Sequence, residues 1–249
     1  MSYGKLSAEF YDADKPLADE EELSLYQQEF KANDLLLEPM CGSGRLLIPL
    51  LQAGLRVHGF DSSKMMLENC KKRAEQLNLS PNLRHCKIEN FPEKQLYDGI
   101  IIPIGSFQLL YPRETVVRAL TKFRHLLNPG GRLIMDLFIP WEVMCEDNDN
   151  IEDIRQVQLS PSQSIRLETK TTVNKLDQHM LSKLFYTKLS DNKCIEQEEE
   201  RLHICWYYPH EMNLILEKHR FHNIKYEQRN ISSGEYVTFI CSKPDSLKI

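Results

Sequence analysis

Two short apolar runs of this chain each end in an acidic residue, and a glycine-rich turn follows the first. The residues concerned are Glu38, Gly42 and Gly44 after the run 35–37, and Asp61 after the run 55–60. Runs of this length are typical of buried strands, and glycine lets a backbone turn tightly against a ligand. A carboxylate at a strand end can pair with a cation or accept hydrogen bonds from the two hydroxyls of a ribose. The pattern therefore indicates a site for a nucleoside cofactor that carries a cationic group.

The glycine turn by itself leaves two other interpretations open. An ordinary strand-to-helix turn also uses glycine, and a nicotinamide-dinucleotide site begins with a similar Gly-x-Gly. The dinucleotide pattern needs a third glycine, however, where this chain has Leu47, and its sites usually carry no acid where Glu38 stands.

The second acidic strand end is followed by the start of a helix. Ser63 is a typical N-cap residue and predicts a helix that runs to Leu77. We expect Asp61 to bind the ribose with Ser62 beside it, and Met66, one helical turn further on, to lie against an adenine ring.

Together these residues resemble the class I S-adenosylmethionine-dependent methyltransferases. The first motif of that family is acid-x-x-x-Gly-x-Gly, and its second strand ends in an acid followed by x-Ser-x-x-Met. The positions that match are Glu38, Gly42, Gly44, Asp61, Ser63 and Met66. The resemblance implies S-adenosyl-L-methionine as the cofactor, S-adenosyl-L-homocysteine as the product, and methyl transfer by in-line displacement.

Later segments extend the resemblance through about residue 140. Lys87 stands where the family usually has the aspartate that contacts adenine, so the resemblance assigns this contact to the Ile88 backbone and Glu89. It also implies that Pro103, at the tip of the fourth strand, and Tyr11, on an amino-terminal helix that closes over the cofactor, contribute to cofactor binding.

These residues need a framework of alternating strands and helices to position them. Apolar runs alternate with helical periodicities up to about residue 140, which predicts an α/β fold: a doubly wound, Rossmann-like, mostly parallel sheet. A helix at 209–218 and strands at 223–229 and 235–241 resemble the family's reversed C-terminal hairpin. We predict a cofactor-binding core formed by residues 1–149 and 207–249.

Between these two parts, the sequence has the period of two that is typical of antiparallel strands. The runs 165–173, 179–189 and 195–205 alternate between polar and apolar residues and predict an inserted antiparallel β lid over residues 150–206. In small-molecule members of the family such an insertion covers the substrate pocket and often takes part in oligomer contacts. The resemblance thus implies a lid or substrate domain and a homodimer through this insertion. We interpret the acidic run 196–200 as surface that confers solubility.

The predicted acceptor is the N or O atom of a small molecule, and its cavity requires aromatic walls. Phe138, Trp141 and Trp206 are the candidates, although each could equally belong to the packed junction between the two sheets. No catalytic residue is assigned, because a sulfonium methyl group is already electrophilic and a dedicated base can be absent. His203 and His210 are alternatives for deprotonating the acceptor.

Composition narrows the class of partner and the location. The net charge is −5 with 31 basic and 36 acidic side chains, so we expect no nucleic-acid partner. Seven scattered cysteines show neither a disulfide framework nor metal-ligand spacing, and no stretch is long and apolar enough for a membrane span. These features predict a cytoplasmic protein that binds no metal and no membrane. A methyltransferase acting on protein or RNA, and a non-catalytic cofactor-binding module, remain as alternatives.

Overall fold

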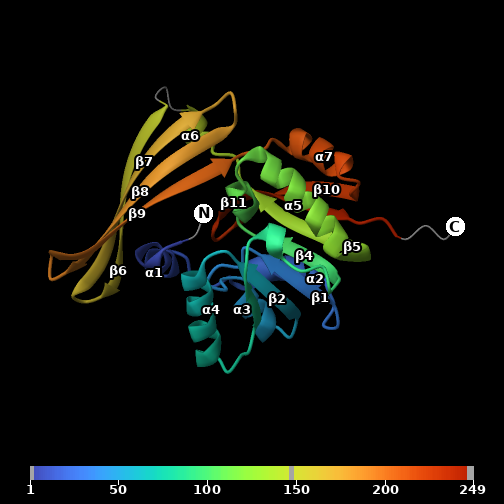
Figure 1. Cartoon of the computed structure of the whole chain (residues 1–249), viewed down its shortest axis with the longest axis horizontal. Coiled ribbons are helices and arrows are strands. Elements are labelled where there is room, and N and C mark those ends of the chain that lie inside the picture. Colours follow the sequence, from blue (N-terminus) through green and yellow to red (C-terminus); the bar gives the residue numbers. More distant parts are fainter. Residues whose placement is uncertain (1–2, 146–148, 246–249) are drawn as a thin grey trace.

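The computed structural model describes residues 3–145 and 149–245 of the chain, which form two β-sheets with helices around the larger one (Figure 1). The larger sheet has seven strands in the order β10-β11-β5-β4-β1-β2-β3. Pairs from β3 to β5 are parallel, whereas β11 runs antiparallel to both β5 and β10. The strands are β1 Leu35–Pro39, β2 Arg56–Asp61, β3 Asn82–His85, β4 Tyr97–Ile102, β5 Leu127–Leu137, β10 His222–Ile231 and β11 Gly234–Ser242.

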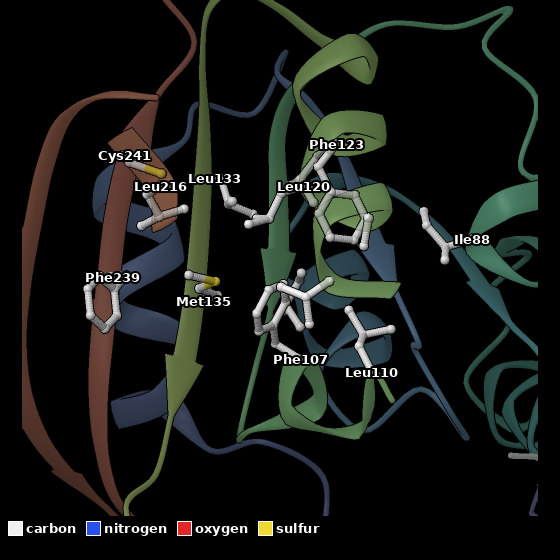
Figure 2. Close-up of a cluster of buried hydrophobic side chains, with 14 of the residues drawn as sticks. Ile88, Phe107, Leu110, Leu120, Phe123, Leu133, Met135, Leu216, Phe239 and Cys241 are labelled. Carbon is white, nitrogen blue, oxygen red and sulfur yellow. The ribbon is translucent and has the colours of Figure 1, made fainter. Parts of the chain in front are cut away.

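Helices cover both faces of this sheet because its central strands are apolar on both sides. Leu36 on one face packs in a cluster with α2, α3 and α4, while Leu35 and Leu37 on the other face share a cluster with α5 and α7. Part of the second cluster is drawn in Figure 2, where Leu120 of α5 points toward Leu133 of β5. The helices are α2 Glu20–Glu29, α3 Leu47–Gln52, α4 Lys64–Gln76, α5 Arg113–Leu126, α6 Trp141–Cys145 and α7 Pro209–Lys218, with short 3-10 turns η1 Ile88–Asn90 and η2 Ser106–Leu109.

The smaller sheet is an antiparallel meander in the order β6-β7-β8-β9, inserted between α6 and α7. It stands to one side of the larger sheet in Figure 1. The predicted runs correspond to β7, β8 and β9, while the first strand lacks a regular alternation and was not predicted as a strand. The bounds are β6 Asn150–Ser160, β7 Gln163–Asn174, β8 His179–Ser190 and β9 Lys193–Cys205.

The amino-terminal helix α1, Lys5–Asp14, packs on the inserted sheet. Its Leu6 and Phe10 are buried in a cluster with Ile165 and Leu184 of that sheet. Ion pairs reinforce the contact, among them Lys188 with Glu9 at 2.6 Å. The amino-terminal segment therefore joins the insertion to the core.

The acidic run 196–200 corrects one of the sequence predictions. Glu196, Glu198 and Glu200 alternate with exposed residues, and all three point toward the start of α1. Glu196 forms an ion pair with Lys5, and the other two accept hydrogen bonds from the first turn of the helix. The interpretation as plain solubilising surface is wrong, because a strand places every second side chain on its covered face.

The fold class agrees with the prediction: a doubly wound Rossmann-like sheet with a reversed C-terminal hairpin and an inserted antiparallel sheet. The Ser63 cap is confirmed, since its hydroxyl accepts a hydrogen bond from the Met66 backbone N–H at 3.3 Å. The helix predicted at 209–218 has the same bounds in the structure.

Candidate cofactor and acceptor site

A cavity of about 360 Å³ opens at the carboxyl ends of β1, β2 and β4, on the side where the inserted sheet and α1 lie. This is the edge at which ligands bind in doubly wound sheets. Its lining consists of Tyr3, Tyr11, Pro39, Met40, Gly42, Phe60, Asp61, Ser62, Met66, Cys86, Lys87, Ile88, Glu89, Ile104, Gly105, Ser106, Leu109, Leu110, Tyr111, Thr115, Phe123, Phe138, Leu202 and Ile204.

The turn after β1 holds its glycines in the left-handed region, with φ of 53° at Gly42 and 81° at Gly44. A Cβ added to Gly42 would meet no atom within 4 Å, so the backbone there borders open cavity space. A Cβ on Gly44 would lie 2.5 Å from the sulfur of Cys70. The first glycine leaves room for a ligand, and the second lets the turn pack on α4.

Asp61 ends β2 at the cavity wall and is nearly buried. Its carboxylate accepts hydrogen bonds from the backbone N–H groups of Gly42 at 2.9 Å and Ser63 at 2.7 Å. Burial raises the pKa of this carboxyl group, while those hydrogen bonds lower it. Asp61 thus ties the glycine turn to the start of α4, and Ser62 beside it lines the cavity.

Glu38 lies deeper, at the end of β1, and is only 2% exposed. One of its carboxylate oxygens, Oε2, is buried without a hydrogen-bond partner in the described part of the chain. Burial raises the pKa of Glu38 well above its usual range, and nearby Arg45 opposes the shift. A buried carboxylate with an unused oxygen, next to cavity-lining Pro39, suits a cationic ligand.

The predicted adenine residues gather on one wall of the cavity. Met66 from α4 and Ile88 from η1 are buried, while Glu89 is exposed at the rim. Lys87 also lines the cavity, although the sequence analysis assigned the adenine contact to Ile88 and Glu89 instead. This wall offers two apolar side chains for a flat ring and polar groups at its edge.

Tyr11 of α1 lines the cavity together with Tyr3, which the sequence analysis did not predict as a site residue. Their rings meet edge to face with centroids 5.9 Å apart. The backbone carbonyl of Tyr3 accepts a hydrogen bond from the Ser63 hydroxyl at 2.7 Å. Tyr3 is thereby fixed over the Asp61 end of the cavity.

Phe138, just past β5, lines the opposite half of the cavity and is held rigidly. Its backbone N–H and carbonyl bond to the buried Gln108 amide at 2.8 and 2.9 Å. Its ring covers Gly105, where an added Cβ would lie 2.6 Å from a ring carbon.

The other predicted residues, like Glu38, lie outside the cavity lining. Gly44 and Pro103 are buried beside it. Trp141 is half exposed on α6, on a separate surface pocket. Trp206 is fully buried among Val173 and Met180, at the base of the inserted sheet. Trp206 therefore has the alternative environment considered above, in the packed junction of the sheets, whereas Trp141 lies on the surface.

The sequence did not indicate Tyr111, Leu202 or Ile204, which line the cavity from the loop after η2 and from β9. Leu202 and Ile204 are apolar residues in the alternating sequence of β9. The alternation predicts that both lie on the covered face of the strand, but it does not predict that this face borders a cavity. His203 lies behind Tyr111 and bonds to His179 at 3.0 Å. Burial lowers the pKa of both imidazoles.

Comparison with known proteins supports the interpretation of this geometry. Residues 36–131, which include the glycine turn and Asp61, match a protein-family model described as a methyltransferase domain. Residues 36–131 of the chain therefore form a methyltransferase domain. A curated relative of this methyltransferase is the tRNA U34 carboxymethyltransferase of Idiomarina loihiensis, 29% identical over 109 residues. The alignment covers 42% of this chain and 32% of the relative, so the chain matches about a third of that protein's length.

Solved structures resemble this methyltransferase over nearly its whole length. The CcbJ methyltransferase from Streptomyces caelestis has 20% identity and a TM-score of 0.74, with 99% of each chain covered. The sugar N-methyltransferase KedS8 from a Streptoalloteichus species has 14% identity and a TM-score of 0.75, covering 98% of this chain and 95% of its own. At these identities the likeness establishes the shared fold, inserted sheet included.

Within residues 3–145 and 149–245, no group of three or more His, Cys, Asp or Glu side chains is arranged to hold a metal ion. In the same residues, no helix has both the length and the apolar character needed to cross a bilayer.

Proposed function

We propose that this methyltransferase transfers a methyl group from S-adenosyl-L-methionine to an N or O atom of a small molecule. The observation that carries the proposal is the pair of buried acids at neighbouring strand ends, Glu38 and Asp61, on either side of a glycine turn that borders the cavity. That arrangement fits the cofactor's two polar parts, its cationic methionine end and its ribose.

The residues present fit this cofactor in detail. Glu38 has a free buried oxygen for the methionine ammonium group, and Asp61 stands at the strand end where a ribose is bound in related folds. The open space above Gly42 admits the ligand backbone, and Met66 with Ile88 can sandwich or flank the adenine ring. When bound, the cofactor supplies an electrophilic methyl group: the acceptor lone pair forms the new N–C or O–C bond, the S–C bond breaks with its electron pair passing to sulfur, and the acceptor's proton goes to water.

The chain's own contribution is position and the exclusion of water. Tyr3 and Tyr11 of the amino-terminal segment and Leu202 and Ile204 of β9 line the cavity and reduce the access of water to it. Phe138, held by Gln108, gives the acceptor a fixed wall. Because a base is not needed to activate the methyl group, no catalytic residue is proposed.

A small acceptor is favoured because the inserted sheet and α1 border the cavity, and because its volume is close to the lower size limit of small-molecule pockets. The full-length resemblance to a sugar N-methyltransferase agrees with this. Transfer to RNA is a second candidate, since the curated relative is a tRNA-modifying enzyme. A non-catalytic module is the third.

The test is formation of S-adenosylhomocysteine, measured by mass spectrometry with panels of small amines and phenols and with bulk tRNA. We expect turnover with members of the small-molecule panels, lost in Asp61→Ala and kept in Asp153→Ala, a control in the exposed part of β6. Formation of S-adenosylhomocysteine only in the presence of tRNA would overturn the proposal that the acceptor is a small molecule. Cofactor binding without transfer to any acceptor would favour the non-catalytic module.

We also propose a domain division, an oligomeric state and a cellular location for the protein. The division into a core of 1–149 with 207–249 and an inserted lid of 150–206 stays a prediction, as does a homodimer through the lid. Light scattering coupled to gel filtration, on the whole chain, tests the dimer. A cytoplasmic location agrees with all seven cysteines being free thiols.

A further inference from the structure

Tyr111, in the loop between η2 and α5, has an unusual arrangement of neighbouring rings. Its ring stacks on His203 with centroids 4.2 Å apart and planes at 6°, and on His179 at 4.7 Å and 21°. The two imidazoles are 5.2 Å apart, nearly parallel, and hydrogen-bonded to each other at 3.0 Å. They are too close together to lie on opposite faces of the phenol ring. Both imidazoles therefore form one flat support behind a single face of Tyr111.

The opposite face of Tyr111 is available to a ligand. The side chain is 46% exposed and lines the cavity, and no other ring in the described ranges stacks on it. Burying an exposed aromatic face against a second flat ring is favourable when the rings are offset or edge to face. The cavity thus contains a half-exposed aromatic side chain whose second face no other ring of the described chain covers.

The loop that carries Tyr111 is fixed to the base of the inserted sheet. Arg113 donates a hydrogen bond to the backbone carbonyl of Asp177 at 3.0 Å and forms an ion pair with Glu211 at 3.1 Å. Its guanidinium group also lies 4.9 Å from the centre of the Tyr207 ring. With the imidazoles behind it and this anchor beside it, Tyr111 has little freedom to turn away.

The lining residues that follow β4 in the sequence include no charged side chain in the described ranges. They come from the β4 end, η2, α5, the β5 end and β9, and are Ile104, Gly105, Ser106, Leu109, Leu110, Tyr111, Thr115, Phe123, Phe138, Leu202 and Ile204. Only Ser106, Thr115 and the tyrosine carry side-chain polar groups, and all three are neutral hydroxyls. An ammonium group that left water for this space would find no carboxylate to pair with.

We propose that the methyl acceptor is an uncharged aromatic compound, a phenol or an aromatic amine, that stacks on the free face of Tyr111. This inference rests on the proposed function, since it assigns the other half of the cavity to the cofactor. The ring of the acceptor lies between Tyr111 and the apolar walls, and the hydroxyls of Ser106 and Thr115 provide hydrogen bonds for its polar atom. A charged amino sugar does not fit this lining.

The test is isothermal titration calorimetry on the full chain saturated with S-adenosylhomocysteine, so that no turnover occurs. The probes are 4-methylphenol, 2-naphthol and glucosamine, which is charged at neutral pH. The variants are Tyr111→Phe, which keeps the aromatic face, and Tyr111→Leu and Tyr111→Ala, which remove it. Tyr226→Ala, an exposed tyrosine on β10 outside the cavity, is the matched control.

We expect at least one phenolic probe to bind the wild-type chain and glucosamine not to bind. Affinity for that probe falls about tenfold in Tyr111→Leu and Tyr111→Ala and changes little in Tyr111→Phe and Tyr226→Ala. Tighter binding of glucosamine, no binding of either phenolic probe, or equal affinity in Tyr111→Leu and wild type would each overturn the inference. Failure of S-adenosylhomocysteine itself to bind would instead overturn the proposed function, so the two failures are distinct.

Discussion

Glu198 of β9 accepts a hydrogen bond from the backbone N–H of Ser7 in α1 at 3.0 Å. The same carboxylate accepts from the N–H groups of Lys5 at 2.8 Å and Leu6 at 3.1 Å. The first N–H groups of a helix have no partner within it and carry partial positive charge, so a carboxylate there stabilises the helix. The inserted sheet thereby caps the helix whose Tyr11 lines the cofactor cavity, across 191 positions of sequence.

Removing this cap is expected to weaken cofactor binding and stability together. In Glu198→Ala three backbone donors lose their acceptor, which costs about 1–2 kcal/mol of unfolding free energy and loosens α1 over the cavity. We predict a several-fold higher Kd for S-adenosylhomocysteine by calorimetry and a lower midpoint in urea. Glu199→Ala is the control, because its side chain is exposed on the other face of β9. Equal behaviour of the two variants would show that the cap has no such role.

Glu38 gives a prediction in which stability and binding change in opposite directions. Because its folded-state pKa is raised, the stability it contributes is present below its ordinary pKa of 4.5 and is lost as pH rises through the folded-state value. The cost of burying this carboxyl group in the cofactor-free protein is thus larger at pH 8 than at pH 5. Glu38→Gln should raise its Tm by about 3 °C at pH 8, with a smaller gain at pH 5, and should weaken S-adenosylmethionine binding about tenfold.

Calorimetry and thermal unfolding of the same Glu38→Gln sample check both effects, with the exposed Glu227→Gln as control. A variant that loses stability at pH 8, or that binds the cofactor as tightly as wild type, would contradict this role of Glu38.

The two glycines of the turn are expected to respond differently to alanine. Gly42→Ala places a methyl group in open cavity space, so its main effect is a weaker cofactor affinity, with a strain cost of about 1 kcal/mol from the positive φ. Gly44→Ala drives a methyl group against the Cys70 sulfur and Ile48, so it should lose more stability. Urea unfolding ranks the two for stability, and calorimetry on the folded variants ranks them for affinity. If Gly42→Ala were less stable than Gly44→Ala, the different roles assigned to the two glycines would be refuted.

Arg45 and Glu22 form a buried ion pair between the start of α3 and α2. The two guanidinium nitrogens donate to the two carboxylate oxygens at 2.6 and 2.7 Å, and both side chains are nearly inaccessible. Arg45→Met leaves Glu22 unpaired and should cost about 3–5 kcal/mol of unfolding free energy, whereas Arg45→Met with Glu22→Leu should recover most of that loss. Chemical denaturation of both variants measures this. A double variant as unstable as the single one would mean that packing, not charge, dominates here.

Much of the fold was predictable because the strands and helices carry local signals. The Ser63 cap, the apolar stripe of α5 and the proline at the start of α7 all agree with the structure. Strand β6 was missed because Ile154 lies on its exposed face and the regular alternation is broken there. The docking of α1 on the inserted sheet depends on contacts between distant parts of the chain, which periodicity cannot reveal.

The proposed cofactor half of the cavity was also largely accessible from the sequence, since Gly42 and Asp61 lie at strand ends and Met66 lies one helical turn further on. The acceptor half was not. Tyr111 and Ile204 meet only because a loop of the core reaches the base of the inserted sheet, and Trp206 occupies the interior of that junction. The presence of an aromatic residue in the sequence did not show whether its ring lines a cavity or packs in the core.

The most direct test of the account is calorimetric titration of the chain with S-adenosylmethionine, S-adenosylhomocysteine and NAD, repeated with Asp61→Ala. We predict micromolar binding of both sulfur nucleosides, no binding of NAD, and loss of binding in the variant while its fold is retained. Absence of binding by either sulfur nucleoside would contradict the assignment of this cavity to S-adenosylmethionine.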